Sequence, residues 1–244
     1  MKNQKNINLL QVSQLYKSFG NKKILENISF EMGKGEFVLL TGSNGSGKTT
    51  LIRIISSLCS HDEGEIKIFE TSLKKDFEIV KSKIGFGMHK SMMYDDFTGK
   101  ENLEYSSDLY GTTNKKGNLK DIVDRFQLTE ILDKKIKYLS QGQIKRIANA
   151  KAFLNNPKLI ILDEPDSGLD TQSHEILFRE IIEQKKLGTS ILLASHRLKK
   201  WVDIADQVFF MENSSLINIT NDRKNLISWT LLKLYGISLK EISF

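Results

Sequence analysis

The sequence has few of the features that mark secreted or membrane-spanning proteins. Cys59 is the only cysteine among the 244 residues, so no internal disulfide is possible, which is typical of a reducing compartment. The first ten residues, MKNQKNINLL, lack the apolar stretch of a signal peptide, and no window reaches the ~20 apolar residues of a membrane span. We therefore expect a cytoplasmic protein whose membrane contact, where it has one, is peripheral.

Arginine-rich clusters and basic strips interleaved with aromatic residues are also absent. The net charge is +6, but lysine, isoleucine and asparagine are all abundant, so general lysine-rich usage explains the charge and no nucleic-acid partner is expected. Hydrophobic residues at 39% and charged residues at 27% are ordinary globular values. The length suits one domain spanning residues 1–244.

Alternating apolar strands and helices predict an α/β fold with a parallel sheet. Buried strands are expected where aliphatic runs lie between glycines or prolines, and Pro157 and Pro165, the only two prolines, bound one of them. Residues 98–155 have helical periodicity throughout, with Ile144, Ile147 and Ala148 on one face. The expected strands are 7–16, 24–32, 36–42, 64–70, 84–89, 158–162, 190–196 and 207–212, and the expected helices outside 98–155 are 49–58, 174–186 and one through Trp201.

A glycine-rich loop follows the strand FVLL and precedes the next helix. It fits the pattern G-x-x-x-x-G-K-[ST] from Gly42 to Thr49, whose glycines let backbone amides surround phosphate oxygens. Lys48 reaches the β- and γ-phosphates, and the Thr49 hydroxyl is a ligand for Mg²⁺. The guanine-reading sequence Asn-Lys-x-Asp is absent, because NKKI at 21–24 and NKKG at 114–117 lack the aspartate. Adenine is therefore the expected base.

Two carboxylates end a second buried strand in the sequence LIILDEP. Asp163, at the carboxyl end of the strand, is placed to hold the metal, usually through water. Glu164 is placed to orient and polarise the attacking water. The alternative is a pair of solvated turn residues. The loop and the carboxylates together predict an ATP-hydrolysing site that uses Mg²⁺.

The sequence YLSQGQIKRIANAKAFLNNPKLIILDEPDSGLD resembles the ATP-binding cassette family, whose signature matches LSQGQ at 139–143. The P-loop, signature, Walker B strand, D-loop and switch histidine occur in family order over about residues 7–212. The resemblance implies a P-loop NTPase (RecA-like) α/β core with an N-terminal antiparallel β subdomain. It also implies an inserted α-helical subdomain at about 98–155 and a short C-terminal extension, 213–244.

The resemblance further implies a head-to-tail dimer that holds each ATP between two copies, or between paired cassettes. Ser140 and Gly142 then serve the γ-phosphate of the opposite subunit, beside Gln143 of the same signature. Asp170 resembles the D-loop aspartate that bridges the two sites. Ser140 and Asp170 are also good N-caps for the helices that follow, and both roles are compatible for Asp170.

Two further residues resemble family positions at the edges of the nucleotide. Phe19 precedes Lys48 by 29 residues (48 minus 19), where the family has an aromatic that stacks on adenine; Tyr16 is the competing candidate. His196 resembles the switch histidine that contacts the γ-phosphate, the alternative being a structural histidine at a helix start.

His89 stands where most relatives have a metal-sensing glutamine. Together with LSQGQ and the segment 90–111, it resembles the ATPases of haem exporters for cytochrome c maturation, while exporters of drugs, lipids or ions remain alternatives. Met88, Met92 and Met93 nearby are interpreted as contacts for a membrane subunit and not as haem ligands. The rival classes are a soluble cassette ATPase acting on nucleic acid or ribosomes and a module that binds ATP without hydrolysing it.

The resemblance therefore implies the ATPase subunit of a transporter, and of an exporter in particular. Such a subunit is peripheral on the inner face of the cell membrane and is partnered by polytopic transmembrane subunits. Its expected catalytic residues are Glu164, His196 and Lys48, and its expected Mg²⁺ residues are Thr49, Asp163 and His89. The expected ATP-binding residues are Phe19, Gly42, Ser43, Asn44, Gly45, Ser46, Gly47, Lys48, Thr49, Thr50, His89, Ser140, Gly142, Gln143 and Asp170.

Overall fold

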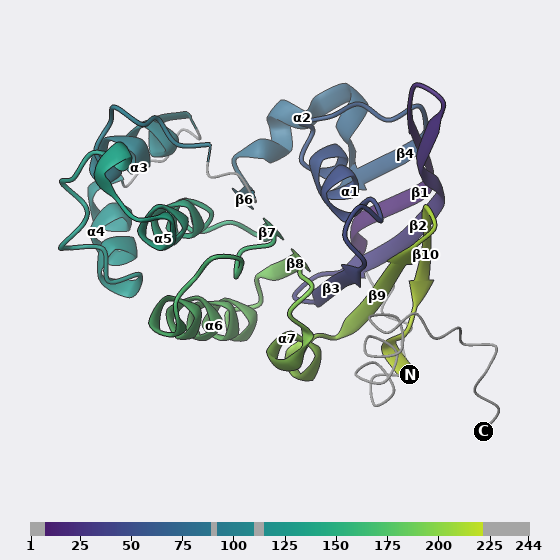
Figure 1. Ribbon diagram of the computed structural model, residues 1–244. Helices are drawn as coiled ribbons and strands as arrows, with labels where there is room; N and C mark the ends of the chain where they lie inside the picture. The colour runs from purple at the N-terminus through teal and green to yellow at the C-terminus, as the bar shows by residue number, and fades with distance from the viewer. Residues whose placement is uncertain (1–7, 89–91, 110–114, 222–244) are drawn as a thin grey trace, which may run out of the picture.

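The computed structural model describes residues 8–88, 92–109 and 115–221, which form two sheets and the helices around them (Figure 1). His89 and most of the C-terminal extension, 213–244, lie outside the described residues. No helix in the described ranges is long and apolar enough to cross a bilayer.

The larger sheet has six strands in the order β10-β9-β3-β8-β7-β6, parallel except for β10. Every residue of β7 and β8 is buried, as expected of aliphatic strands covered on both faces. Because β3, β8 and β7 are neighbours, the chain leaves all three at one edge of the sheet, where ligands bind in open α/β sheets. The strands are β3 Phe37–Gly42, β6 Ile84–Gly87, β7 Leu159–Asp163, β8 Ser190–Ala194, β9 Gln207–Glu212 and β10 Ser215–Asn218.

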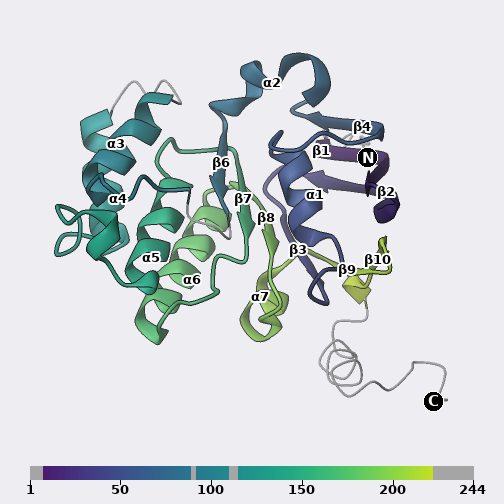
Figure 2. The same cartoon turned by 45° about the horizontal axis from the view of Figure 1, so that its top comes forward.

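The smaller sheet is antiparallel, with strand order β2-β1-β4-β5. Its strands are β1 Asn8–Phe19, β2 Lys22–Gly33, β4 Glu63–Ile68 and β5 Thr71–Ser72. Helix α1, Lys48–Ile55, lies between the two sheets (Figure 2). Its buried Leu51, Ile52 and Ile55 join aliphatic residues of both sheets in one hydrophobic cluster. This packing holds the glycine loop, which precedes α1, against the start of β2, where Gly47 adjoins Ile24.

Helices α3, α4 and α5 lie together at the side of the larger sheet that is farther from the smaller one (Figure 2). They span Gly99–Leu109, Lys115–Arg125 and Gln141–Lys151, and a 3-10 turn covers Ile136–Tyr138. Leu103, Ile122, Phe126 and Ile147 are buried in a cluster shared with α6 Thr171–Lys186 and α7 Leu198–Ile204. The buried face expected for α5 is confirmed, since Ile147 and Ala148 are at most 3% exposed.

The helical periodicity expected throughout 98–155 corresponds to helices α3, α4 and α5, but residues 126–135 between them form turns and bends. Leu128 and Ile131 are buried in the same cluster, so apolar side chains at helical spacing reach the core from non-helical backbone. Helix α2, Leu73–Lys81, was not predicted. It is mostly charged and has a non-helical residue, Asp76, which explains the weak sequence signal.

Candidate active site

The glycine loop between β3 and α1 has a backbone that only glycine adopts readily. Gly42, Gly45 and Gly47 have φ angles of 144°, 78° and 111°. A Cβ atom on Gly42 would lie 2.2 Å from the Met211 carbonyl oxygen, and one on Gly47 would lie 2.9 Å from that of Ile24. The loop therefore leaves no room for side chains at Gly42 and Gly47, which are the two glycines fixed by the sequence pattern.

Lys48 begins α1 and lies under the loop, with only 6% of its surface exposed. Its Nζ donates hydrogen bonds to the carbonyl oxygens of Gly42 at 2.8 Å and Ser43 at 2.9 Å. Burial lowers the pKa of Lys48, while the nearby carboxylates of Glu164 and Asp163 oppose this shift. The ammonium group is thus held at the centre of the loop, where phosphate oxygens would neutralise it.

Asp163 ends β7 fully buried, and its Oδ1 accepts a hydrogen bond of 3.2 Å from the Thr49 hydroxyl. This pairing of one carboxylate with one hydroxyl suits Mg²⁺, a hard cation that proteins bind through one or two carboxylates and substrate phosphates. Among the described residues no group of three or more His, Cys, Asp or Glu side chains gathers as a metal cage. The donor set therefore fits Mg²⁺ bound together with a nucleotide.

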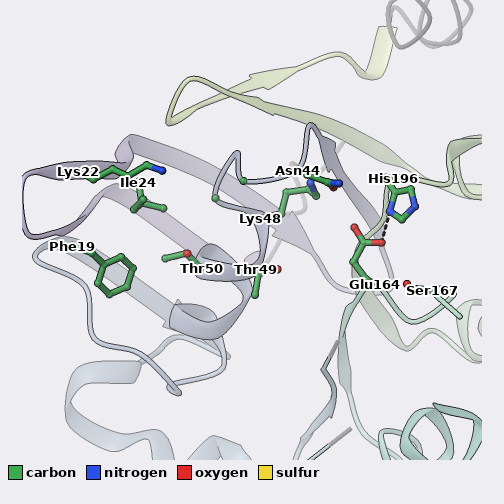
Figure 3. A pocket seen from close by; sticks show the side chains of 12 residues that line it. Phe19, Lys22, Ile24, Asn44, Lys48, Thr49, Thr50, Glu164, Ser167 and His196 are labelled. Carbon is green, nitrogen blue, oxygen red and sulfur yellow. Dashed lines mark hydrogen bonds and ion pairs between the residues drawn. The ribbon is translucent and has the colours of Figure 1, made fainter. Parts of the chain in front are cut away.

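Glu164 and His196 face each other from the ends of β7 and β8. His196 Nδ1 lies 2.6 Å from Glu164 Oε2, the contact drawn as a dashed line in Figure 3. Glu164 has a positive φ of 48°, and its amide donates to the Ala194 carbonyl oxygen at 2.8 Å. The side chain of Glu164 is 12% exposed and that of His196 is 50% exposed. A carboxylate capable of polarising water is thus paired with an accessible imidazole.

Lys48, Glu164 and His196 line one pocket of about 620 Å³, whereas the buried Asp163 does not line it. Phe19 and His196 lie at opposite sides of it, with Lys48 and Thr49 between them (Figure 3). Of the residues predicted from sequence, the pocket is lined by Phe19, Asn44, Gly45, Gly47, Lys48, Thr49, Thr50, Glu164 and His196. Lys22, Ile24 and Ser167 also line it and were missed, since each lacks a motif position. Ser43, Ser46 and Gly42 lie in the loop but do not line the pocket.

Phe19 is favoured over Tyr16 as the aromatic residue that stacks on adenine, because of its exposure and its position. Phe19 is 54% exposed at the pocket wall, whereas Tyr16 does not line the pocket. The Lys17 ammonium lies 5.1 Å from the centre of the Phe19 ring, on a side chain that also bonds Asp62 at 2.9 Å. An exposed aromatic ring at a pocket wall is suited to stack on a flat base.

The signature residues and Asp170 do not line the pocket of their own chain. Ser140 caps α5: the Gln143 amide donates to Ser140 Oγ at 3.3 Å, and the Ser140 amide donates to Gln143 Oε1 at 3.0 Å. A Cβ on Gly142 would lie 3.5 Å from the Gly168 carbonyl oxygen, so the signature adjoins the turn after β7.

Asp170 caps α6 by accepting a 2.7 Å hydrogen bond from the Ser173 amide, which lowers the pKa of Asp170. The structure thus contains the capping role expected for both Ser140 and Asp170. Neither residue contacts a nucleotide site within one copy, so any role in binding needs a second copy.

Residues 25–167 match the sequence profile of the family described as ABC transporter. The chain belongs to this family. The cassette also resembles the linearmycin resistance ATP-binding protein LnrL of Bacillus subtilis (strain 168), at 32% identity over 213 residues, covering 86% of this chain and 68% of LnrL. The ribose import ATP-binding protein RbsA of the same organism is 31% identical over 240 residues, which cover 95% of this chain and 49% of RbsA.

Among solved structures, one described as the ATP-binding subunit of an ABC transporter superposes with a TM-score of 0.84 at 26% identity, covering 93% of this chain and all of that one. The predicted α/β P-loop NTPase fold is thereby confirmed. The cassette binds ATP and is an ATPase, as members of its family are. Cassettes of this family work with transmembrane subunits and dimerise.

Proposed function

We propose that this cassette is the MgATP-hydrolysing subunit of an exporter and acts by closing as a dimer around ATP. The observation that carries the proposal is the single pocket that gathers Phe19, Lys48, Thr49, Glu164 and His196 from four separate segments. The whole of residues 1–244 acts as one nucleotide-binding domain. Its 98–155 helices carry the signature, and 213–244 form an extension.

The triphosphate is held by the loop amides from Gly42 to Thr50, with Lys48 at the β- and γ-phosphates. Thr49 and Asp163 hold Mg²⁺, which neutralises charge on the phosphate oxygens when bound, and His89 is proposed to contact it. Phe19 stacks on the adenine at the far side of the pocket. Ser43 and Asn44 are exposed and give the loop its polar surface, while Ser46 lies in the loop with its hydroxyl buried.

Hydrolysis uses the pair at the ends of β7 and β8. Glu164 orients and polarises the attacking water, and His196 contacts the γ-phosphate and steadies Glu164 through their 2.6 Å contact. A preorganised pair of this kind contributes most when closure excludes bulk water. Chemistry and the mechanical step then share one conformational change.

The second copy completes the site. Ser140 Oγ accepts from the Gln143 amide, so its own proton remains able to donate to a γ-phosphate oxygen of the opposite subunit. Gly142 adds its amide at the start of α5, Gln143 fixes the cap, and Asp170 bridges the two sites. The position of all four outside the pocket of their own chain supports this division of labour.

Work is transmitted to a polytopic transmembrane subunit through the loop around residues 90–100, where Met92 and Tyr94 are at least 50% exposed. The cassette would thus be peripheral on the inner face of the cell membrane. Export is supported by the likeness to LnrL, named for resistance, although RbsA is named for import. Haem is the proposed cargo on the resemblance carried by LSQGQ and His89.

The ATPase role is tested on the full chain purified with its membrane subunit. Glu164→Gln should slow phosphate release by at least about 100-fold, because general-base catalysis contributes 10²–10⁴. Glu130→Gln, on an exposed turn outside the pocket, is the control and should keep the normal rate. A wild-type complex that binds ATP but releases no phosphate would instead identify a regulatory module.

The direction of transport is tested in vesicles whose cassettes face outward, so that only these copies meet added MgATP. An exporter accumulates cargo in the lumen, and haem, a hydrophobic antibiotic and a fluorescent phospholipid are compared as cargo. ATP-driven loss of preloaded cargo contradicts export. If the antibiotic or the lipid accumulates but haem does not, haem is the wrong cargo and export is still the direction of transport.

A further inference from the structure

Two side-chain links, not one, join the turn after β7 to the turn after β8. The first is the contact between Glu164 and His196. The second lies deeper: Asp166, fully buried, accepts hydrogen bonds from the Ser195 hydroxyl at 3.1 Å to Oδ1 and 2.9 Å to Oδ2. Each link thus joins one residue of the first turn to one of two consecutive residues in the second.

Ser195 fixes the backbone on both sides of His196. Its hydroxyl donates to Asp166 and accepts a 2.9 Å hydrogen bond from the amide of Arg197. Its own amide donates to the Leu40 carbonyl oxygen of β3 at 3.1 Å. The residue before His196 and the residue after it are therefore both held by one hydroxyl, whose orientation depends on Asp166.

Asp166 is itself anchored from a third element. Trp201 Nε1, in α7, donates to Asp166 Oδ2 at 2.9 Å. The Trp201 side chain is fully buried and packs edge-on against Phe37 and tilted against Phe178. Its position is therefore set by the hydrophobic core, and it fixes the carboxylate relative to β3 and α6.

The signature helix α5 also contacts this turn. Asn149 Nδ2 donates to the Pro165 carbonyl oxygen at 2.9 Å, and the buried Lys145 is attracted electrostatically to Asp166. Burial lowers the pKa of His174, which packs on Trp201, and the same carboxylate opposes this shift. The charge of Asp166 is thus compensated by Lys145 of α5 as well as by its hydrogen bonds.

A buried carboxylate is costly, and an apolar side chain would often stabilise the fold as well or better. Asp166 accepts from the hydroxyl of Ser195, which directly precedes His196, and the same hydroxyl accepts from the amide of Arg197, which directly follows it. We propose that Asp166 is a positioning residue for ATP hydrolysis, which acts through Ser195 to hold the His196 imidazole against Glu164 and the γ-phosphate. This inference rests on the proposed roles of Glu164 and His196.

The primary test is Asp166→Asn in the full chain with its membrane subunit. The Ser195 hydroxyl and Trp201 Nε1 both donate to Oδ2, so an amide oxygen at that position still accepts from both. The amide NH₂ group, however, replaces the Oδ1 acceptor 3.1 Å from the Ser195 hydroxyl and places a donor against it, which turns the hydroxyl. The kcat for ATP should fall on the order of 10- to 100-fold, the effect of a small misplacement of a catalytic group. The KM for ATP should change less than about twofold, because Asp166 does not line the pocket.

Ser195→Ala is the second variant, since it removes only the hydroxyl and keeps the buried shape. It should reproduce the loss of kcat, and the double variant should be no worse than either single one. Asp124→Asn, exposed on α4 outside the pocket, is the matched control and should behave as wild type. Wild-type kcat in both Asp166→Asn and Ser195→Ala overturns the proposal.

A measurement on His196 itself distinguishes the positioning role of Asp166 from a purely structural one. Asp166→Asn should shift the ring nitrogen resonances of His196 in ¹⁵N spectra, and should reduce kcat much less in a His196→Ala background. An equal fractional loss in both backgrounds overturns the positioning role. Glu164→Gln and His196→Ala are measured alongside: if both keep full activity, the proposed function fails; if both are inactive and Asp166→Asn is normal, only this inference fails.

Discussion

Thr49 Oγ1 lies 3.2 Å from Asp163 Oδ1, which joins the first turn of α1 to the carboxyl end of β7. Two segments separated by 114 positions thus supply one hydroxyl and one carboxylate to the same point. These are the oxygen ligands that Mg²⁺ prefers. Changing Asp163 should therefore alter the Mg²⁺ requirement of hydrolysis without altering metal-free ATP binding.

Asp163→Asn should raise the Mg²⁺ concentration needed for half-maximal hydrolysis by about 10- to 100-fold, the usual cost of losing a metal-supporting carboxylate. Binding of ATP in the presence of EDTA should change little. Mg²⁺ titrations of the ATPase rate measure the effect, with Asp133→Asn on an exposed turn as control. An unchanged Mg²⁺ requirement would remove Asp163 from the metal site.

Phe19→Ala should weaken ATP binding by about 1–3 kcal/mol, the typical contribution of stacking between a base and an aromatic side chain. Phe19→Trp should keep most of the affinity, because it retains a flat ring. Calorimetric titration with ATP gives the dissociation constants. Tyr16→Ala serves as the comparison, and the assignment is wrong if Tyr16→Ala weakens binding while Phe19→Ala does not.

Two glycines of the loop should respond differently to alanine. Gly45 has a positive φ but no atom within 4 Å of an added Cβ, so Gly45→Ala should cost about 1–2 kcal/mol of unfolding free energy from backbone strain. Gly42→Ala brings a Cβ to 2.2 Å from the Met211 carbonyl oxygen of β9 and should cost at least about 3 kcal/mol. Urea unfolding measures both, and equal losses would contradict the geometry.

His174 should make stability depend on pH. Burial lowers the pKa of His174, an effect that the Asp166 carboxylate opposes. In the window just below the ordinary value of 6.5, the unfolded chain binds more protons at this position, so stability is lost as pH falls. Between pH 7.5 and 5.5, the unfolding free energy of wild type should therefore fall relative to that of His174→Gln. A pH-independent difference would show that the shift is absent.

The site residues that belong to sequence motifs could be predicted from the sequence, because each motif requires a fixed local geometry. The loop from Gly42 to Thr49 needs glycine where φ is positive, and Asp163 follows four other buried strand residues at the ligand-binding edge. Both features follow from short-range rules.

Residues that enter the site through tertiary packing could not be predicted in this way. Ser167 and Ile24 line the pocket only because the turn after β7 and the start of β2 meet around α1. Asp166 was passed over in the sequence DEPDSGLD, since its partners Ser195 and Trp201 are 29 and 35 positions away. The choice between Phe19 and Tyr16 likewise depended on exposure, which no local pattern gives.

The central claim is that each ATP is held by the loop of one copy and the signature of another. It is tested most directly by measuring the mass of Glu164→Gln in solution by light scattering, with MgATP and without nucleotide. The account predicts that Glu164→Gln forms a dimer only with MgATP. The double variant Glu164→Gln/Ser140→Arg should stay monomeric even with MgATP, because the arginine side chain blocks the facing site. A Glu164→Gln protein that binds MgATP and stays monomeric, both alone and at the membrane subunit, would contradict the account.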